Sequence, residues 1–318
     1  MDLLLEKLGE VGGLHFMDTG DVHSRDLSIA ALVELTDRDP SSVTGLRTLC
    51  VVLQARPDAT GEITDAEELI ARARRLRALV PAGDDRWTAE WIIAGGLFAR
   101  HRLRRDPAGL NEAITLYRRA AAQVSPADSR SAEILSMLIR ALVARFDVLG
   151  ASDDIHEATA VADRLDALPL ASGSGGVLVN AANALSAAYE RTADPGFAIR
   201  AAGLIRHGRD LMSPRDPQFC ATSSALASAL IDQAAVDPGD RPKLLAEAVT
   251  AARDATDLPA GHRDRAAYLA QYADMLLQAS PEPAGHLDMA VTAAHAAVQE
   301  ARTGTDTASA LAVLARAL

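Results

Sequence analysis

The chain has 318 residues, of which 49% are hydrophobic but only 3% aromatic, and 43 acidic against 32 basic residues give it a formal net charge of −11. This charge would repel a phosphate backbone, which argues against nucleic acid as a partner. The two cysteines lie far apart and outside any CxxC or Cys/His cluster. A disulfide framework and a structural zinc site are therefore not expected.

The N-terminal part of the chain is less regular than the rest. MDLLLEKLGE carries charges at Asp2, Glu6 and Lys7 and has no basic region followed by an apolar run, so we do not expect it to act as a signal peptide. No stretch approaches 18 uninterrupted apolar residues. We therefore expect a soluble, cytoplasmic protein without a membrane partner. Residues 1–40 are expected to form an irregular helical cap, and SSVTGLRTLCVVLQAR (41–56) the first helix of a degenerate repeat.

Two series of helical segments then alternate with a shared period of about 45 residues. In the segment around Glu112, apolar residues recur at i, i+3, i+4, i+7 and i+11, the stripe of an amphipathic helix. The first series aligns on Leu97, Leu142, Leu185, Leu230 and Met275, and the second on the anchor positions Glu67, Glu112, Glu157, Arg200, Glu247 and Met289. Turn signals such as RDPAG and GASDD separate the segments.

The repeating unit is therefore a helical hairpin. Such a hairpin cannot bury its apolar stripe alone, so neighbouring units must stack. We expect an all-α fold, a right-handed α-α superhelix of about five to six hairpins over residues 41–318, with a concave face. The C-terminal SALAVLARAL reads as an apolar helix without a polar capping unit. We expect this helix to contact a downstream domain, a partner or a second copy of the chain.

Three segments carry a family resemblance. ALVARFDVLGASDDIHEA, ALSAAYERTADPG and DPAGLNEAITLYRRAAA resemble tetratricopeptide (TPR) repeats, in the long variety that precedes CHAT caspase-like protease domains in many actinobacterial proteins. The resemblance covers residues 41–318 and implies a TPR-like solenoid. No protease segment is present here, so if a CHAT protease is involved it must lie downstream or in another chain. Leu138-Ile139 and Gln271-Tyr272 depart from the Leu-Gly pair of the family.

The stretch ASDDIHEA (151–158) crowds Asp153, Asp154, His156 and Glu157 together, as a metal or acid–base site would. By repeat phase, however, Glu157 is equivalent to Glu112, and Asp154 with Glu157 fits a capping box. Ligands at one helix start also have no opposed partner to complete a coordination shell. We expect a helix cap here, and neither metal, cofactor nor catalytic residues in the chain. SGSGG (172–176) is expected to be a flexible linker, because it follows no strand and lacks the lysine of a phosphate loop.

The resemblance implies that the first helix of each pair lines the groove. Equivalent positions on these helices define the predicted groove residues, which are small and polar apart from one aromatic ring and one guanidinium. They are Trp91, Ser136, Arg140, Asn183, Ser186, Ser224, Ser228 and Asp232. Such a strip suits an extended peptide held by hydrogen bonds. The alternative is that these positions are merely solvated.

These features lead to a functional hypothesis. We expect a non-enzymatic scaffold or sensor that binds a protein or peptide, as the regulatory region of a larger signalling or protease system. A second hypothesis is a regulator that senses a small molecule or peptide enclosed by its helical array. A third, an enzyme of specialised metabolism, requires a deep pocket with convergent acid and base groups.

Overall fold

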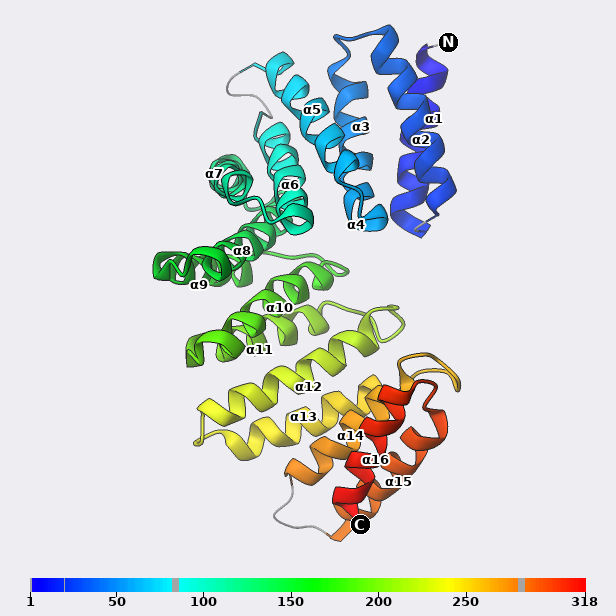
Figure 1. Cartoon of the computed structure of the whole chain (residues 1–318), viewed down its shortest axis with the longest axis vertical. Helices are drawn as coiled ribbons and strands as arrows, with labels where there is room; N and C mark the ends of the chain where they lie inside the picture. Colours follow the sequence, from blue (N-terminus) through cyan, green and yellow to red (C-terminus); the bar gives the residue numbers. More distant parts are fainter. Residues whose placement is uncertain (1, 20, 82–85, 280–283) are drawn as a thin grey trace. The chain divides into compact units, whose positions relative to one another are not determined.

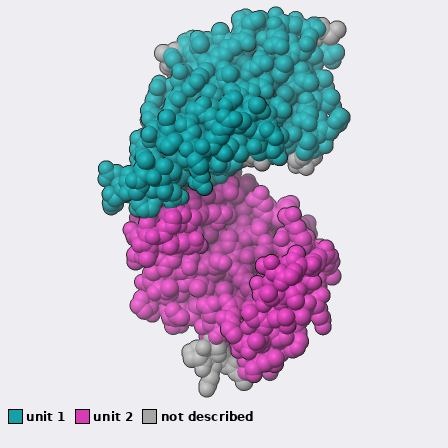
Figure 2. Space-filling view, viewed as in Figure 1, with its two compact units in different colours: residues 1–158 teal, residues 159–318 magenta. Residues whose placement is uncertain are grey.

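The protein is described by a computed structural model that covers residues 2–19, 21–81, 86–279 and 284–318. All regular structure in these ranges is helical (Figure 1). The chain divides into two compact units, residues 1–158 (unit 1) and 159–318 (unit 2), which are coloured separately in Figure 2. The prediction of an all-α fold is confirmed.

Unit 1 holds the first eight helices and the beginning of the ninth. They are α1 (Asp2–Thr19), α2 (Val22–Arg38), α3 (Val43–Leu53), α4 (Arg56–Thr60), α5 (Ile63–Leu79), α6 (Arg86–Arg104), α7 (Pro107–Gln123), α8 (Arg130–Leu149) and α9 (Ser152–Asp166). Consecutive helices pack together, α1 on α2, α5 on α6, α6 on α7 and α7 on α8. Helices α1 and α2 lie within residues 1–40, whose predicted capping role stays a prediction.

Unit 2 holds the rest of α9 and seven further helices among its described residues. They are α10 (Gly175–Thr192), α11 (Pro195–Asp210), α12 (Phe219–Val236), α13 (Arg241–Ala255), α14 (Arg265–Ala279), α15 (Ala284–Glu300) and α16 (Gly304–Ala317). The closest pairs are α10 with α11, α12 with α13 and α14 with α15. The first predicted series corresponds to α6, α8, α10, α12 and α14, and the second to α5, α7, α9, α11, α13 and α15.

Helix boundaries follow from local chemistry that repeats along the chain. Asp106 precedes Pro107 at the start of α7, and its carboxylate accepts from the backbone N–H of Gly109. Asp194 precedes Pro195 at the start of α11, and its carboxylate accepts from the backbone N–H of Gly196. An Asp-Pro pair suits a helix start, because the carboxylate satisfies an unpaired N–H while proline has none to satisfy.

Glycine allows α10 and α11 to cross at backbone contact. A Cβ atom on Gly175 would lie 2.1 Å from the carbonyl oxygen of Gly208, and one on Gly208 would lie 2.8 Å from the carbonyl oxygen of Gly175. The SGSGG segment is thus only in part the predicted linker, because Gly175 and Gly176 already belong to α10. Gly173, in the loop itself, has a left-handed φ of 93°.

A ladder of ion pairs joins successive helices of the second series. In each pair, the anchor residue of one helix meets a charged residue six or seven positions after the anchor of the preceding helix. The pairs with an acidic anchor are Arg74 with Glu112, Arg118 with Glu157 and Arg206 with Glu247, and the reversed pair is Asp163 with Arg200. At α15 the anchor is Met289, which cannot continue the ladder.

By length and composition, α12 is the one helix among the described residues apolar enough to cross a membrane. It packs against both α11 and α13. Leu226, Ala227 and Leu230 of this helix are fully buried, while Ser228 on the same helix is exposed. This is the pattern of an amphipathic core helix in a helical array.

Candidate functional site

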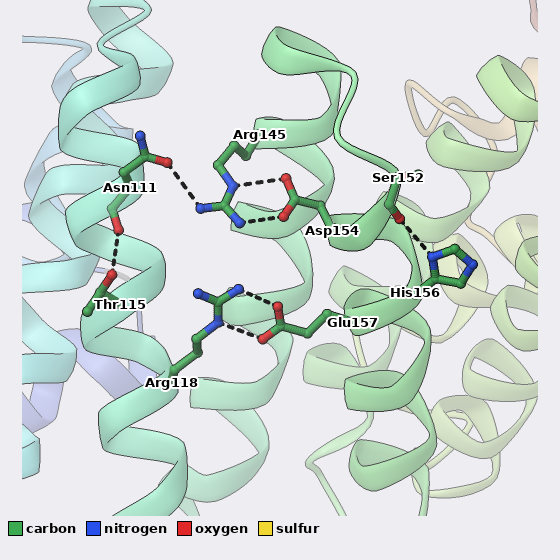
Figure 3. A network of polar contacts seen from close by, with 8 residues as sticks. All are labelled: Asn111, Thr115, Arg118, Arg145, Ser152, Asp154, His156 and Glu157. Carbon is green, nitrogen blue, oxygen red and sulfur yellow. Dashed lines mark hydrogen bonds and ion pairs between the residues drawn. The ribbon is translucent and has the colours of Figure 1, made fainter.

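The cluster in ASDDIHEA forms ion pairs with the two preceding helices (Figure 3). Both carboxylate oxygens of Asp154 accept from the guanidinium of Arg145 in α8, and Asp154 is 1% exposed. Arg145 also donates to the side-chain oxygen of Asn111 in α7, at 3.1 Å. The hydrogen bond with Asp154 raises the pKa of Arg145 above its usual value. The carboxylate therefore holds α9 against α8.

The predicted capping box at this turn is wrong in detail. Helix α9 begins at Ser152, two residues before the predicted cap Asp154. Glu157 does not turn back to the cap but pairs with Arg118 of α7, whose pKa it raises through the hydrogen bond. His156 is exposed, and its Nδ1 lies 3.0 Å from the carbonyl oxygen of Ser152 (Figure 3). Among the described residues, no group of three acidic, histidine or cysteine side chains could hold a metal ion.

In unit 1, Trp91 is the predicted groove residue that lines a cavity. It is one of a helical stripe on α6, with Gly95, Phe98, Ala99 and Arg102, that faces this space. The cavity has a volume of about 300 Å³. Helix α8 contributes Glu133 and Met137 to the lining, and further walls come from α1, α3 and α5. The first helices of successive pairs thus share one hollow, and most of its lining is apolar.

The other two predicted groove residues of unit 1, Ser136 and Arg140, are not part of this lining. Arg140 lies over the ring of Phe98, 5.6 Å from its centroid, and donates to the sulfur of Met137 at 3.0 Å. Ser136 is buried, at 3% exposed. Arg140 therefore contacts two lining residues, and Ser136 offers almost no surface to a ligand.

Glu133 is the distinctive charged group of the cavity. Its side chain is accessible to solvent, but the surrounding protein atoms desolvate the carboxylate, which raises the pKa of Glu133. No hydrogen bond or ion pair links it to another described residue. Arg102, also in the lining, is already engaged in an interaction of its own.

In unit 2, Ser224 and Ser228 of α12 are joined to α14 by one amide. Gln271 accepts from the hydroxyl of Ser224 at 2.7 Å, and it donates to the Ser224 carbonyl oxygen and to the hydroxyl of Ser228, both at 2.9 Å. Gln271 is one of the departures from the family pattern noted in the sequence. Its amide cross-links the first helices of two successive hairpins, so these serines are partly committed to structure.

The remaining predicted groove residues of unit 2 differ in exposure. Asn183 is exposed, and Ser186 and Asp232 are half-buried. Burial, and secondarily the charge of Glu190, raise the pKa of Asp232. The structure does not gather these three around a cavity of the kind seen in unit 1.

Sequence reasoning missed most of the cavity lining. Gly95 and Phe98 occupy the same repeat phases as the predicted groove residues, but their apolar character excluded them from a search for polar strips. Glu133 and Met137 lie seven and three positions before Arg140, on the same helical stripe, and this spacing could have identified them. Phe16, which comes from α1, gave no such signal.

Comparison with solved structures agrees with the helical hairpin array. The chain is similar to the C-terminal part of a TPR repeat-containing protein from Cytophaga hutchinsonii, with a TM-score of 0.55 and 11% identity over 98% of this chain and 99% of that one. It is also similar to yeast Tom70, with a TM-score of 0.43 and 13% identity over 93% and 61%. No protein-family model and no curated protein matches the sequence. The first similarity shows the fold, a TPR-like α-solenoid.

Proposed function

We propose that this chain is a non-enzymatic scaffold or sensor that binds a protein or peptide through unit 1. The observation that carries the proposal is the cavity lined mainly by α6 and α8, with walls from α1, α3 and α5, which includes the predicted groove residue Trp91. An apolar hollow beside accessible polar groups is the usual form of a site that anchors one side chain of a partner.

The test fills the cavity without removing any contact. A Cβ on Gly95 would meet nothing closer than 3.4 Å, so Gly95→Met projects its side chain from α6 into the hollow. The control is Gly203→Met in α11, where a Cβ has open space. Affinity capture from an extract of the source cells, followed by mass spectrometry, should recover the same partners with wild type and Gly203→Met and lose them with Gly95→Met. Equal recovery by all three folded proteins would contradict the proposal.

A second candidate is a regulator that senses a small molecule. The size of the cavity favours it, since about 300 Å³ lies at the lower end of the range of small-molecule sites. A metabolite that raises the melting temperature of wild type but not of Gly95→Met, with no protein partner recovered, would support this candidate over the first.

The wider setting is also a proposal. The resemblance to repeats that precede CHAT proteases supports a regulatory role in a cytoplasmic signalling or protease system. Helix α16 leaves Leu311 49% exposed, which supports a contact of this helix with another domain or a second copy. Size-exclusion chromatography with light scattering of wild type and Leu311→Glu tests the second copy.

A further inference from the structure

Glu133 differs from the other acidic residues that lie near the core of unit 1. Asp154 is paired with Arg145, and buried Glu90 lies 2.5 Å from a guanidinium nitrogen of Arg119. The Glu133 carboxylate has no such partner among the described residues. It lies in the first turn of α8, where a negative charge suits the helix dipole. The dipole accounts for an acidic residue there, but not for its place in the lining of an apolar cavity.

The surroundings of Glu133 favour a cation brought by a ligand. Aromatic and aliphatic side chains, among them Trp91, Phe98 and Met137, form most of the cavity. A carboxylate beside such a wall loses part of its hydration, and a pairing cation compensates for that loss. The guanidinium groups nearby do not fill this role, because Arg102 is already engaged and Arg140 lies against Phe98.

We infer that the cavity of unit 1 binds a basic peptide, with an apolar side chain in the hollow and an adjacent lysine or arginine paired with Glu133. This inference rests on the proposed function. The volume of about 300 Å³ suits one large side chain better than a folded surface. The methylene stem of a lysine or arginine can lie along Met137 while its charged end reaches the carboxylate. The net charge of −11 also attracts a basic segment over distance.

The test is selection of a random peptide library displayed on phage against the full chain. Wild type should enrich peptides in which lysine or arginine is adjacent to a large apolar residue. Glu133→Lys should enrich acidic residues in place of the basic ones. Glu67→Lys, an equal change of charge at an exposed position of α5 that does not line the cavity, should keep the wild-type preference. A synthetic peptide of the enriched sequence should bind Glu133→Lys about tenfold more weakly than wild type in fluorescence anisotropy.

The other outcomes separate this inference from the proposed function. Enrichment of apolar peptides without basic residues, blocked by Gly95→Met, would overturn the role of Glu133 and leave the peptide-binding cavity standing. The same basic preference in Glu133→Lys would also overturn it. If no peptide is enriched and Gly95→Met captures the same partners as wild type, both the inference and the proposed function fail.

Discussion

Asp154 lies in a position from which water is almost excluded. Its carboxylate is compensated there by the guanidinium of Arg145. Removing one member of a buried ion pair leaves the other charge without compensation. We expect Asp154→Ala to lower the free energy of unfolding by about 3 kcal/mol. Glu157→Ala should lower it by less than about 1 kcal/mol, because the pair with Arg118 is partly exposed. Urea unfolding followed by circular dichroism measures both.

A double variant separates the ion pair from the helix position. If Arg145→Met is combined with Asp154→Ala, much of the lost stability should return, since no unpaired charge remains. A loss of only about 1 kcal/mol for Asp154→Ala alone, unchanged by Arg145→Met, would instead indicate a simple capping role.

For single residues, the sequence predicts whether a side chain has a structural role better than it predicts which side chain it contacts. It identified Asp154 and Glu157 as structural residues from their repeat phase. It could not assign Arg145 and Arg118 to them, because those contacts depend on how α7, α8 and α9 pack. Glu133 was missed for a related reason. It differs from the other acidic residues by lying in the cavity, and the cavity is formed by packing that the sequence does not show.

Two glycines of the second unit should respond in opposite directions to the same substitution. Gly175→Ala places a methyl group against the backbone of Gly208, so α10 and α11 must separate. We expect a loss of about 2–3 kcal/mol in the free energy of unfolding. Gly203→Ala in α11 meets open space and should add up to about 1 kcal/mol through helix propensity. Equal effects in thermal unfolding would contradict the close crossing.

The reversed step of the ladder predicts a rescue by charge exchange. Asp163→Arg sets two guanidinium groups against each other and should cost up to about 1 kcal/mol, with a smaller effect at high salt. The double variant Asp163→Arg with Arg200→Asp should recover most of that stability. Absence of recovery would show that the pair contributes nothing measurable to stability.

The elements themselves were well predicted by the sequence. Two independent series with one period located every helix from α5 to α15, because amphipathic stripes and Asp-Pro starts are local signals. SGSGG was read as a linker because glycine suits both a loop and a close helix crossing. Only the position of Gly208 on the facing helix distinguishes these uses.

Across the molecule, the two thiols report on different units. Cys50 is fully buried in unit 1, and burial raises its pKa to about 12. The thiol of Cys50 is therefore almost entirely protonated at pH 8, and the thiolate is the reactive form. Cys220, in unit 2, is half-buried, and burial raises its pKa as well. We expect a disulfide reagent at pH 8 to label Cys220 first and Cys50 only when unit 1 opens.

The Cys220→Ser variant makes this measurement specific. Its single thiol should stay protected in native buffer and become reactive across the urea transition of unit 1. Rapid labelling of Cys50 in native buffer would contradict its burial.

For the whole molecule, the sequence predicted the helical array and its net charge. It could not predict the cavity, because the cavity forms where Phe16 of α1 lies near α6 and α8, and α1 is not part of the repeat series.

The reversed ion pair between Asp163 and Arg200 also limits which hairpins this array can lose while its charges stay matched. An in-frame loss of α9 and α10 would bring Arg118 opposite Arg200, and a loss of α11 and α12 would bring Asp163 opposite Glu247. Both recombinants would juxtapose like charges. A loss of α7 and α8 would bring Arg74 opposite Glu157 and keep the charges matched. Hairpins next to the reversed pair are therefore not interchangeable, because their charges match only the neighbours that they have in the present order.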